Sequence, residues 1–292
     1  PPYNNEKEII EKLEKEINES IERHLVSDVP VNSFLSGGLD SSLIAVIAKE
    51  KLGNLSTYTI GRNKKDQRIE QMPDDEKYAR NISKKFGMNY NEIILDSQII
   101  DLLPKIVKIL DEPIGDPAAI NTYLMCQSAH NNGVKVILSG MGADEIFFGY
   151  RRQKANLFIK KFNSLPFFLK KLIKIIIDIL PVKLFGRGLK LVRWSKKFLS
   201  FEGLNSSSSY RMSYSYYNRN ELTDLLKVGH EYIDDIYNEH DDIYNTIDKY
   251  DEENKMCFTD IKMFMVGLNL TYTDRASMAN SVEVRVPFVD KK

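Results

Sequence analysis

The sequence predicts an α/β protein with a doubly wound parallel sheet and a largely helical C-terminal half. Short runs rich in apolar and β-branched residues alternate with segments of helical spacing through residues 1–138. A Gly-Gly turn at residues 37–38 joins the first such run to the helix that follows it. Ligands of parallel sheets bind at the carboxyl ends of the strands, near the point where the strand order reverses, so we expect the site there.

The elements are expected in a regular order. Residues 5–25 combine high charge with an amphipathic spacing of Ile and Leu, which predicts a lead helix. Strands are expected at 31–35, 55–60, 89–95 and 134–138, with helices at 42–51, 75–86, 98–110 and 118–131. The Glu-Pro and Asp-Pro pairs of residues 111–117 are expected to start the last of these helices, and a second role facing the acceptor stays open.

The composition changes after residue 150. Residues 155–200 are rich in Lys, Leu, Ile and Phe, and residues 210–250 in Tyr, Asp and Asn, which predicts a helical layer over 155–255. Residues 205–209 read Asn-Ser-Ser-Ser-Ser, and we expect an exposed loop rather than a set of phosphorylation sites. The most apolar stretch, 167–185, contains lysines, Asp178 and Pro181, which argues against a membrane span. We expect it to pack on the protein's own core, with a membrane surface as the alternative.

Charge and cysteine usage narrow the class of protein. Lys plus Arg and Asp plus Glu number 41 each, so net charge gives no argument for nucleic-acid binding. Cys126 and Cys257 lack metal-site spacing and a CxxC partner, which predicts buried free thiols in a reducing, cytoplasmic setting. The N-terminal residues show no signal-peptide pattern. The histidines have no metal-ligand spacing, so we assign no role to His24, His130, His230 and His240.

Residues 31–42 have the features of a pyrophosphate-binding loop. An apolar strand passes through Gly37 and Gly38 into a helix, so unpaired N–H groups and the helix dipole converge on one anion site. No lysine lies within 31–48, which excludes a Walker-type loop. The loop instead offers serine hydroxyls and the carboxylate of Asp40. A carboxylate beside a polyphosphate requires a divalent cation between them, so Asp40 predicts Mg²⁺.

Three ordered motifs resemble those of the asparagine synthetases, a family of the N-type ATP pyrophosphatases. The first, at 36–41, reads Ser-Gly-Gly-Leu-Asp-Ser. The second, at 139–145, reads Ser-Gly-Met-Gly-Ala-Asp-Glu and precedes a Gly-Tyr pair at 149–150. The third, at 274–290, begins Asp-Arg-Ala-Ser-Met-Ala and ends Glu-Val-Arg-Val-Pro-Phe-Val-Asp. The resemblance implies a synthetase domain of the adenine-nucleotide alpha-hydrolase type over 26–292, with 1–25 as a linker and lead helix.

The resemblance also implies a reaction and the residues that serve it. An ATP-dependent carbon–nitrogen ligase adenylates a carboxylate, aspartate by default, releases pyrophosphate, and lets ammonia derived from glutamine displace AMP. The cofactors implied are ATP and Mg²⁺. Asp40 and Asp144 are implied as catalytic residues and Mg²⁺ ligands. The residues implied at the ATP and pyrophosphate site are Leu35, Ser36, Gly37, Gly38, Asp40, Ser41, Ile60, Ser139 and Gly140.

Other acidic residues of the motifs receive simpler interpretations. Glu145 is expected to be a first-turn carboxylate that complements a helix dipole. Glu283 and Arg285 are expected to form a buried salt bridge that steadies the Pro-Phe corner at 287–288, with support of the nucleotide and acceptor pocket as the alternative.

Three departures from the family pattern bear on the function. Met141 stands where the family has a glutamate, and a thioether cannot take a proton from ammonium or orient it by charge. The family's catalytic lysine lies downstream of the Pro-Phe-Leu-Asp corner, so we assign that role to neither Lys291 nor Lys292 and expect a truncated C-terminal end. The family's glutaminase domain is absent from this sequence, so we expect it as a partner in the full-length chain.

Several functions stay open at this stage. The acceptor is aspartate by default, with a sugar uronic acid of surface-polysaccharide biosynthesis, or β-lactam-type cyclisation on an internal amine, as alternatives. A tRNA-thiolating or NAD-forming pyrophosphatase is a rival, although a thiolase should show paired cysteines and a basic face. A non-catalytic nucleotide-binding module is another. We expect a small carboxylate and ammonia as partners, no nucleic acid and no membrane span, and leave a homodimer open.

Overall fold

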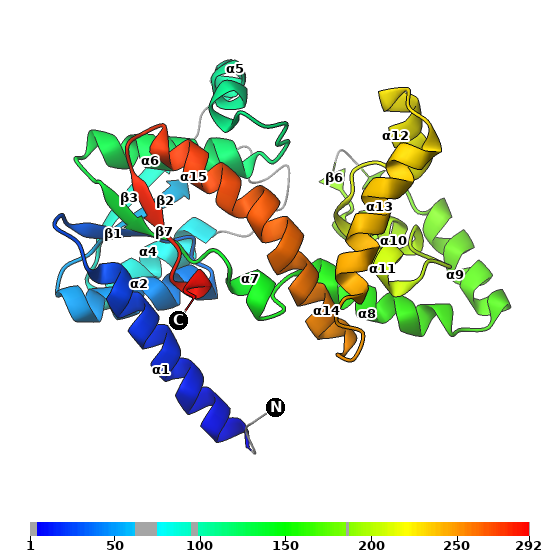
Figure 1. Ribbon diagram of the computed structural model, residues 1–292, viewed down its shortest axis with the longest axis horizontal. Helices are drawn as coiled ribbons and strands as arrows, with labels where there is room; N and C mark the ends of the chain where they lie inside the picture. The colour runs from blue at the N-terminus through cyan, green and yellow to red at the C-terminus, as the bar shows by residue number, and fades with distance from the viewer. Residues whose placement is uncertain (1–4, 62–74, 95–98, 185–186, 292) are drawn as a thin grey trace. The chain divides into compact units, whose positions relative to one another are not determined.

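The computed structural model describes residues 5–61, 75–94, 99–184 and 187–291. The chain divides into two compact units, which are described separately below (Figure 1). The sheet unit comprises residues 1–143 and 266–292, and the helical unit comprises residues 144–265.

The sheet unit contains a five-stranded sheet in which all neighbouring strands are parallel. The strands, in the order in which they pair, are β3 (Asn89–Ile94), β2 (Ser56–Gly61), β1 (Val31–Phe34), β4 (Val136–Leu138) and β7 (Glu283–Arg285). In register, Ser33 of β1 lies opposite Thr57 of β2 and Leu138 of β4. The strand order reverses between β1 and β4, so the crevice at their carboxyl ends is the expected ligand position.

Helices cover both faces of this sheet (Figure 1). The helices of the sheet unit are α1 (Glu6–Leu25), α2 (Leu39–Leu52), α4 (Asp75–Phe86), α5 (Ile99–Leu110), α6 (Ala118–Asn131) and α15 (Thr271–Met278). Successive side chains of a strand point to opposite faces. Val136 and Leu138 of β4 accordingly pack in the cluster that contains α1, α2 and α4, whereas Ile137 packs with Cys126 and Ala129 of α6. The doubly wound parallel sheet predicted from the sequence is confirmed.

The thiols of both units are free. Cys126 is buried, and its burial raises the pKa of the thiol to about 12, so it stays protonated and unreactive. Cys257 is only partly buried, which differs from the fully buried thiol that the sequence predicts.

Element boundaries agree best where the pattern has a strong stop signal. The helices expected at 75–86 and 118–131 are observed with those bounds. Helix α2 begins at Leu39, three residues before the prediction, because Gly38 already serves as its N-cap and accepts from the N–H of Ser42. The sequence does not predict strand β7, because three residues are too few to show alternation.

The sequence predicts a buried salt bridge between Glu283 and Arg285. The pair forms, but it is not buried. The two side chains do pair, with Nε to Oε1 at 2.8 Å, but the Glu283 side chain is 55 % exposed. Arg285 also donates from Nη1 to the carbonyls of His24 (2.7 Å) and Val26 (2.8 Å). These carbonyls lie at the end of α1, where a helix leaves acceptors unsatisfied, so Arg285 anchors the lead helix to the sheet edge.

The helical unit is built from short helices and a two-stranded antiparallel ribbon. Its elements are α7 (Ala143–Ile146, beginning at the last residue of the sheet unit), α8 (Arg151–Asn163), α9 (Phe167–Ile179), β5 (Lys183–Leu184), β6 (Arg187–Gly188), α10 (Lys190–Leu199), α11 (Ser206–Tyr214), α12 (Arg219–Leu226), α13 (His230–Asn245) and α14 (Glu252–Thr259). A π-helix, η1 (Asp260–Leu270), carries the chain back into the sheet unit. Tyr210, Tyr244 and Met256 form the centre of the core of the helical unit.

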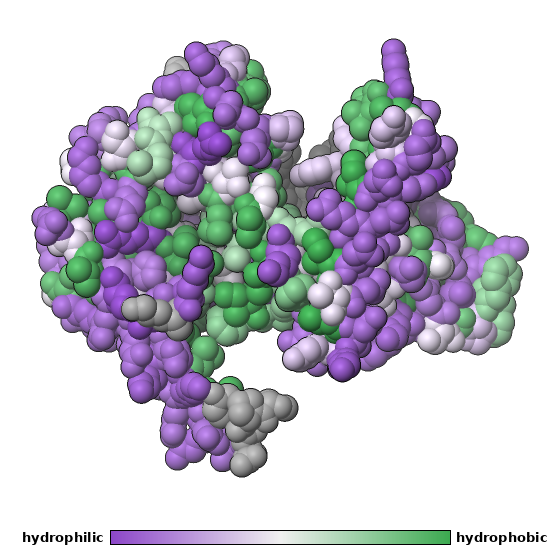
Figure 2. Space-filling model, viewed as in Figure 1, coloured by the Kyte–Doolittle hydropathy of each residue, from purple (hydrophilic) through white to green (hydrophobic). Residues whose placement is uncertain are grey.

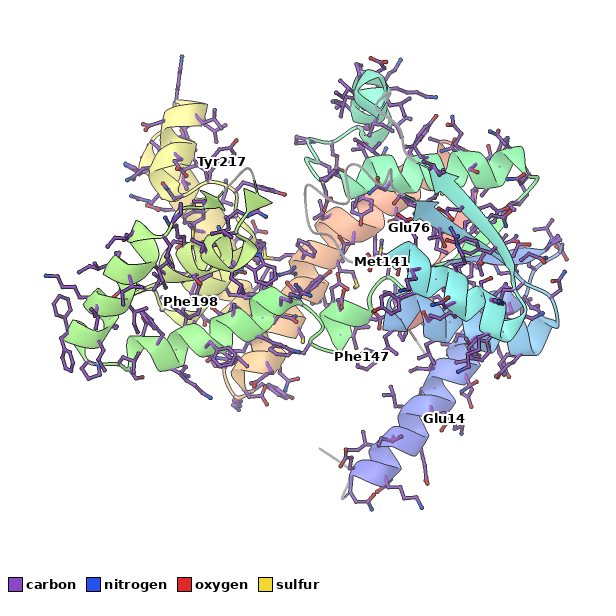
Figure 3. The ribbon with its side chains drawn as sticks, turned by 180° about the vertical axis from the view of Figure 1, so that it is seen from behind. Glu14, Glu76, Met141, Phe147, Phe198 and Tyr217 are labelled. Atoms are coloured by element: carbon purple, nitrogen blue, oxygen red, sulfur yellow. The ribbon has the colours of Figure 1, made fainter. Side chains whose placement is uncertain are left out.

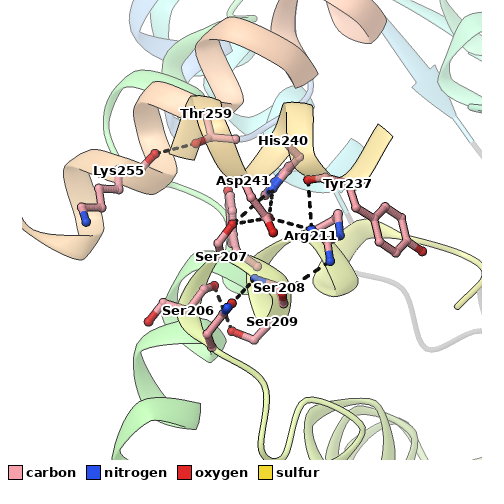
Figure 4. Close-up of polar contacts among 12 residues, drawn as sticks. Ser206, Ser207, Ser208, Ser209, Arg211, Tyr237, His240, Asp241, Lys255 and Thr259 are labelled. Atoms are coloured by element: carbon pink, nitrogen blue, oxygen red, sulfur yellow. Dashed lines mark hydrogen bonds and ion pairs between the residues drawn. The ribbon is translucent and has the colours of Figure 1, made fainter. Parts of the chain in front are cut away.

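The serine run is a helix start, and the expected exposed loop is wrong (Figure 4). Asn205 caps α11 by accepting from the N–H of Ser208 at 2.7 Å. The Ser207 hydroxyl donates to Asp241 at 2.5 Å, and the Ser209 hydroxyl donates to Asn156. Because Ser207 and Ser209 are buried and hydrogen-bonded, tertiary partners supply what a solvated loop would have obtained from water.

Helix α9 also differs from the prediction, because none of its residues is buried. Its most covered apolar side chains, such as Ile173 and Ile177, are only half-buried. The helix therefore does not pack on the core in the way that the apolar stretch 167–185 predicts. None of the helices in the described part of the chain is both long and apolar enough to cross a membrane.

Candidate active site

Backbone geometry fixes the first half of the loop that follows β1. The N–H of Leu35 donates to the carbonyl of Tyr58 at 2.9 Å, and the Leu35 carbonyl accepts from the Thr59 hydroxyl at 2.6 Å. Gly37 follows with a φ of +79°, and a Cβ at this position would lie 2.4 Å from the carbonyl oxygen of Asp75. Only glycine satisfies both the left-handed backbone and the close approach of α4.

Serine hydroxyls join the loop to the start of α2. The N–H of Ser36 donates to Oγ of Ser41 at 3.1 Å, and the two hydroxyl oxygens lie 2.8 Å apart. The Gly38 carbonyl accepts from the hydroxyl of Ser42 at 2.5 Å. Asp40 stands in the first turn of α2, where the first N–H groups have no intrahelical acceptor. The loop thus presents hydroxyls, helix N–H groups and one carboxylate in a short space.

The turn after β4 meets this loop. A Cβ at Gly140 would lie 2.7 Å from the backbone nitrogen of Ser41 and 3.0 Å from the carbonyl carbon of Asp40. The N–H of Ser139 donates to the carbonyl of Arg285 at 2.8 Å, which holds the turn against β7. The structure therefore brings the first two motifs into contact at the carboxyl ends of β1 and β4, as the strand order implies.

A cavity of about 240 Å³ opens beside the loop, at the carboxyl ends of β1 and β2. Three of the residues expected at the nucleotide line it: Leu35, Ser36 and Ile60. Burial raises the pKa of the neighbouring Tyr58, so this phenol stays neutral. Sequence reasoning missed the lining residues from α4 and α6, which are Asp75, Glu76, Ala118, Asn121, Thr122 and Met125. No motif marks them, because helix placement over the sheet decides which side chains reach the cavity.

Met141 lies beside α15 in the sheet unit (Figure 3). It packs against the apolar cluster that includes Tyr123 of α6 and Ala276 of α15. The Thr273 hydroxyl lies 3.5 Å from its sulfur and donates to it. The thioether therefore occupies a half-buried position beside α15, and its proposed role at the acceptor stays a prediction.

Asp144 and Glu145 form the first turn of α7, in the helical unit. Glu145 is buried, and its carboxylate accepts from the Tyr150 hydroxyl at 2.5 Å. The N–H of Gly149 donates to the Asp144 carbonyl at 3.0 Å, and a Cβ at Gly149 would lie 1.9 Å from Oδ1 of Asp144. Gly149 of the second motif thus packs closely against Asp144, and Tyr150 binds the Glu145 carboxylate. Because Asp40 belongs to the other unit, the joint Mg²⁺ site of Asp40 and Asp144 stays a prediction.

The residues of the sheet unit fit a nucleotide with its polyphosphate. Leu35, Ile60 and Met125 give the cavity apolar walls suited to a purine ring. The α2 N-terminus with Ser36 and Ser41 suits phosphate oxygens. Among the described residues, no group of three or more His, Cys, Asp or Glu side chains could hold a metal ion. Mg²⁺ commonly uses one or two carboxylates together with substrate phosphates and water, and Asp40 fits that mode.

Comparison with known proteins identifies the family of this chain. A family model described as asparagine synthase matches residues 12–292. This chain belongs to the asparagine synthase family. The match covers all three motifs: the loop after β1, the turn after β4, and residues 274–290, which include β7. The three motifs therefore lie in one family domain.

Individual relatives are identical to this chain at about a third of the aligned positions. Asparagine synthetase [glutamine-hydrolyzing] 1 of Bacillus subtilis is 32 % identical over 100 % of this chain and 44 % of its own length. A putative asparagine synthetase [glutamine-hydrolyzing] of Mycobacterium bovis is 30 % identical over 94 % of this chain and 40 % of its own length. The chain spans less than half the length of these relatives.

Proposed function

We propose that this chain carries the synthetase site of an ATP-dependent carbon–nitrogen ligase of the asparagine synthase, glutamine-hydrolysing type. The observation that supports it most strongly is the contact between Gly140 and the Asp40–Ser41 backbone at the strand-order reversal. This contact joins two family motifs around one anion-binding helix terminus.

The proposed reaction begins when the acceptor carboxylate attacks the α-phosphorus of ATP. The bond from that phosphorus to the bridging oxygen breaks, and pyrophosphate leaves while an acyl-adenylate forms. Ser36, Ser41 and the α2 N–H groups would hold the departing pyrophosphate in place, and the walls at Leu35 and Ile60 would hold the adenine. Ammonia then attacks the acyl carbon, a proton is lost from nitrogen, and AMP leaves with the acyl–oxygen bond broken.

Asp40 would hold Mg²⁺ against the phosphates, with Asp144 as the second carboxylate. When bound, this ion neutralises charge that develops on the pyrophosphate leaving group. The protein's own contribution is to place these groups before the reaction and to exclude water from the adenylate.

Aspartate is the default acceptor in this proposal. A sugar uronic acid is the second candidate, and the observation that favours it is Met141, whose half-buried thioether carries no charge for ammonium. A glutaminase domain in the full-length protein would supply ammonia, as the glutamine-hydrolyzing names of the relatives and their greater length suggest. A reducing, cytoplasmic setting is consistent with the free thiols.

Separation of the nucleotide products tests the proposal. The full-length protein is incubated with ATP, Mg²⁺ and either ammonium or glutamine, and with aspartate or one of a panel of uronic acids. AMP and pyrophosphate that appear only with one acceptor would support adenylation and identify the substrate. ADP and phosphate, or ATP binding without turnover for any acceptor, would overturn it.

A further inference from the structure

The apolar face of helix α9 is only partly covered by the rest of the helical unit. Leu169, Ile173 and Ile177 repeat at intervals of four and are half-buried against the helical unit. A second stripe recurs at i, i+4, i+7, i+8 and i+11 and points outward. Its members, each between 48 and 75 % exposed, are Phe168, Leu172, Ile175, Ile176 and Ile179. Figure 2 shows apolar residues gathered at the edge of the molecule where Figure 1 places α9.

The segment of the chain that contains this stripe is strongly basic. Residues 151–202, from α8 to just beyond α10, contain fourteen Lys and Arg but only two acidic residues, whereas the whole sequence is balanced at 41 each. On α9 itself, Lys171 borders the outward stripe, whereas Lys170 and Lys174 lie on the side away from it. The two acids are Asp178, on α9, and Glu202, which lies 4.0 and 3.9 Å from Lys170 and Lys174. Arg152 and Lys160 of α8 also pair with acids outside this segment, Asp260 and Glu252. The remaining Lys and Arg still leave a large excess of positive charge.

The packing beneath α9 is loose. A cavity of about 750 Å³ lies between α8, α9 and α10, and its walls are almost entirely apolar. Ile173 and Ile177 form its α9 side, and Trp194 and Phe198 of α10 form part of the opposite side. Trp194 is 46 % exposed and is stacked by the Arg151 guanidinium at 5.2 Å, so an aromatic ring and a cation share the rim.

We propose that α9 and the adjoining end of α10 dock this protein on an anionic lipid bilayer. In-plane amphipathic helices bind at such surfaces by inserting bulky apolar side chains between headgroups while lysines beside them reach lipid phosphates. The outward stripe of α9 would insert, and Leu191 and Trp194 of α10 would border it at the headgroup level. The inference goes beyond the proposed function and does not depend on it.

Charge argues against a second copy of this chain as the occupant. A symmetric dimer through α9 would bring two surfaces with the same excess of Lys and Arg together, and like charges across an interface oppose association. A bilayer that contains acidic lipids supplies the opposite charge and also accommodates a convex apolar stripe without a matching groove. The lipid surface therefore satisfies both features at once.

Vesicle flotation tests the inference on the protein at its natural length, without ATP or acceptor. The vesicles contain phosphatidylcholine alone, or phosphatidylcholine with phosphatidylglycerol. We expect binding to the anionic vesicles that is stronger by about tenfold or more and that weakens as salt is added. The variant Phe168→Ser/Leu172→Ser/Ile176→Ser should lose about tenfold of that binding.

A matched control removes exposed apolar residues elsewhere in the same unit. Leu225, Tyr232 and Ile236 of α12 and α13 are 59 to 62 % exposed and lie in an acidic part of the sequence. Their triple replacement by serine should leave vesicle binding unchanged. The variant Lys171→Gln, at the border of the outward stripe, should weaken binding to anionic vesicles and leave any binding to neutral vesicles unaffected.

Four results would overturn the inference: no vesicle binding, equal binding to neutral and anionic vesicles, full binding by the α9 variant, or equal losses in the α9 and control variants. Sedimentation velocity identifies the alternative occupant. A wild-type dimer that the α9 variant dissolves, without vesicle binding, would assign this face to a second copy of the chain.

Discussion

At the residue scale, one carboxylate and two glycines of the loop region serve distinct purposes. Gly37 supplies a left-handed turn under α4, and Gly140 supplies clearance for the backbone of α2. Neither contributes a chemical group. Asp40 contributes the negative charge that would bind Mg²⁺ beside the pyrophosphate. Replacing it with asparagine tests the role of this charge while the shape of the side chain is kept.

Asp40→Asn preserves side-chain shape and removes the charge. We expect ATP turnover to fall by about 10²–10³-fold, because the proposed Mg²⁺ loses a ligand beside the leaving group. Titrations of ATP with and without Mg²⁺ should also show that Mg²⁺ no longer strengthens binding. Glu50→Gln, at an exposed site on the same helix, should behave as the wild type. Wild-type turnover in the Asp40 variant would contradict the proposal that this loop binds Mg²⁺ and pyrophosphate.

Gly140→Ala places a methyl group against backbone that cannot rotate away. We expect the start of α2 to shift, with a loss of about 1–3 kcal/mol in the free energy of unfolding and a loss of most ATP turnover. Thermal melting and the product assay measure the two effects. Gly115→Ala is the control, since a Cβ there meets no heavy atom within 4 Å. An unchanged melting temperature and rate in the Gly140 variant would contradict the close contact.

Met141→Glu tests the acceptor. A glutamate at this position restores the charge that the family pattern carries, so we expect the ratio of AMP formed with aspartate to AMP formed with uronic acids to rise. Met141→Gln adds polarity without charge and should leave the ratio unchanged. If both variants keep the wild-type acceptor profile, Met141 serves packing against Thr273 and the cluster around α15 alone.

At the scale of elements, local signals predict those helices and strands whose neighbours reinforce them. Helix α6 follows an Asp-Pro stop and ends before Asn132 and Gly133, so its bounds are readable from the sequence. The bounds of helix α11 cannot be read from the sequence, because serines favour loops unless their hydroxyls form hydrogen bonds with distant residues. The sequence does not reveal strand β7 either, because β4, with which it pairs, is distant in the chain.

Ser209→Ala measures what that tertiary partner contributes. The hydroxyl of Ser209 is fully buried and donates to Asn156 and to the carbonyl of Ser206, so its loss leaves a buried amide oxygen without this donor. We expect a loss of about 1–3 kcal/mol in the free energy of unfolding from denaturant titration. Ser208→Ala should cost less than about 0.5 kcal/mol, because that hydroxyl makes only a 3.4 Å contact with Arg211.

At the scale of the whole molecule, the sequence predicts the sheet and the loop, but not the cavity that adjoins them. The position of the loop follows from strand order, which the alternation of strands and helices already implies. Asn121, Thr122 and Met125 enter the cavity because α6 crosses one face of the sheet at a particular angle. Such an angle depends on packing between distant segments, and no local pattern encodes it.

Packing between distant segments also buries one histidine, which no sequence motif predicts. His240 of α13 is 3 % exposed among the rings of Tyr210, Tyr214 and Tyr244. Burial lowers the pKa of this imidazole below its ordinary value of 6.5, although Asp241, 3.2 Å from Nδ1, opposes the shift. Arg211, which pairs with Asp241 at 2.6 Å, acts in the same direction as burial.

This lowered pKa predicts a loss of stability in mild acid. Between pH 6.5 and the folded-state pKa the unfolded chain binds the extra proton, so the free energy of unfolding falls by about 1.4 kcal/mol per pH unit crossed. Above pH 6.5 the histidine contributes no pH dependence. His240→Phe, which leaves the Arg211 and Ser207 contacts of Asp241 in place, should therefore melt with a shallower decline from pH 7 to pH 5.

Fluorescence of Trp194, the single tryptophan of this sequence, follows melting in the helical unit that contains His240. The difference between the wild type and the His240 variant should widen as the pH falls and stay constant above pH 7. His130→Gln, at an exposed site in the sheet unit, should retain the wild-type slope. Parallel melting curves for wild type and His240→Phe at every pH would show that the imidazole has the same pKa in the folded and unfolded states, and that Asp241 fully offsets the effect of burial.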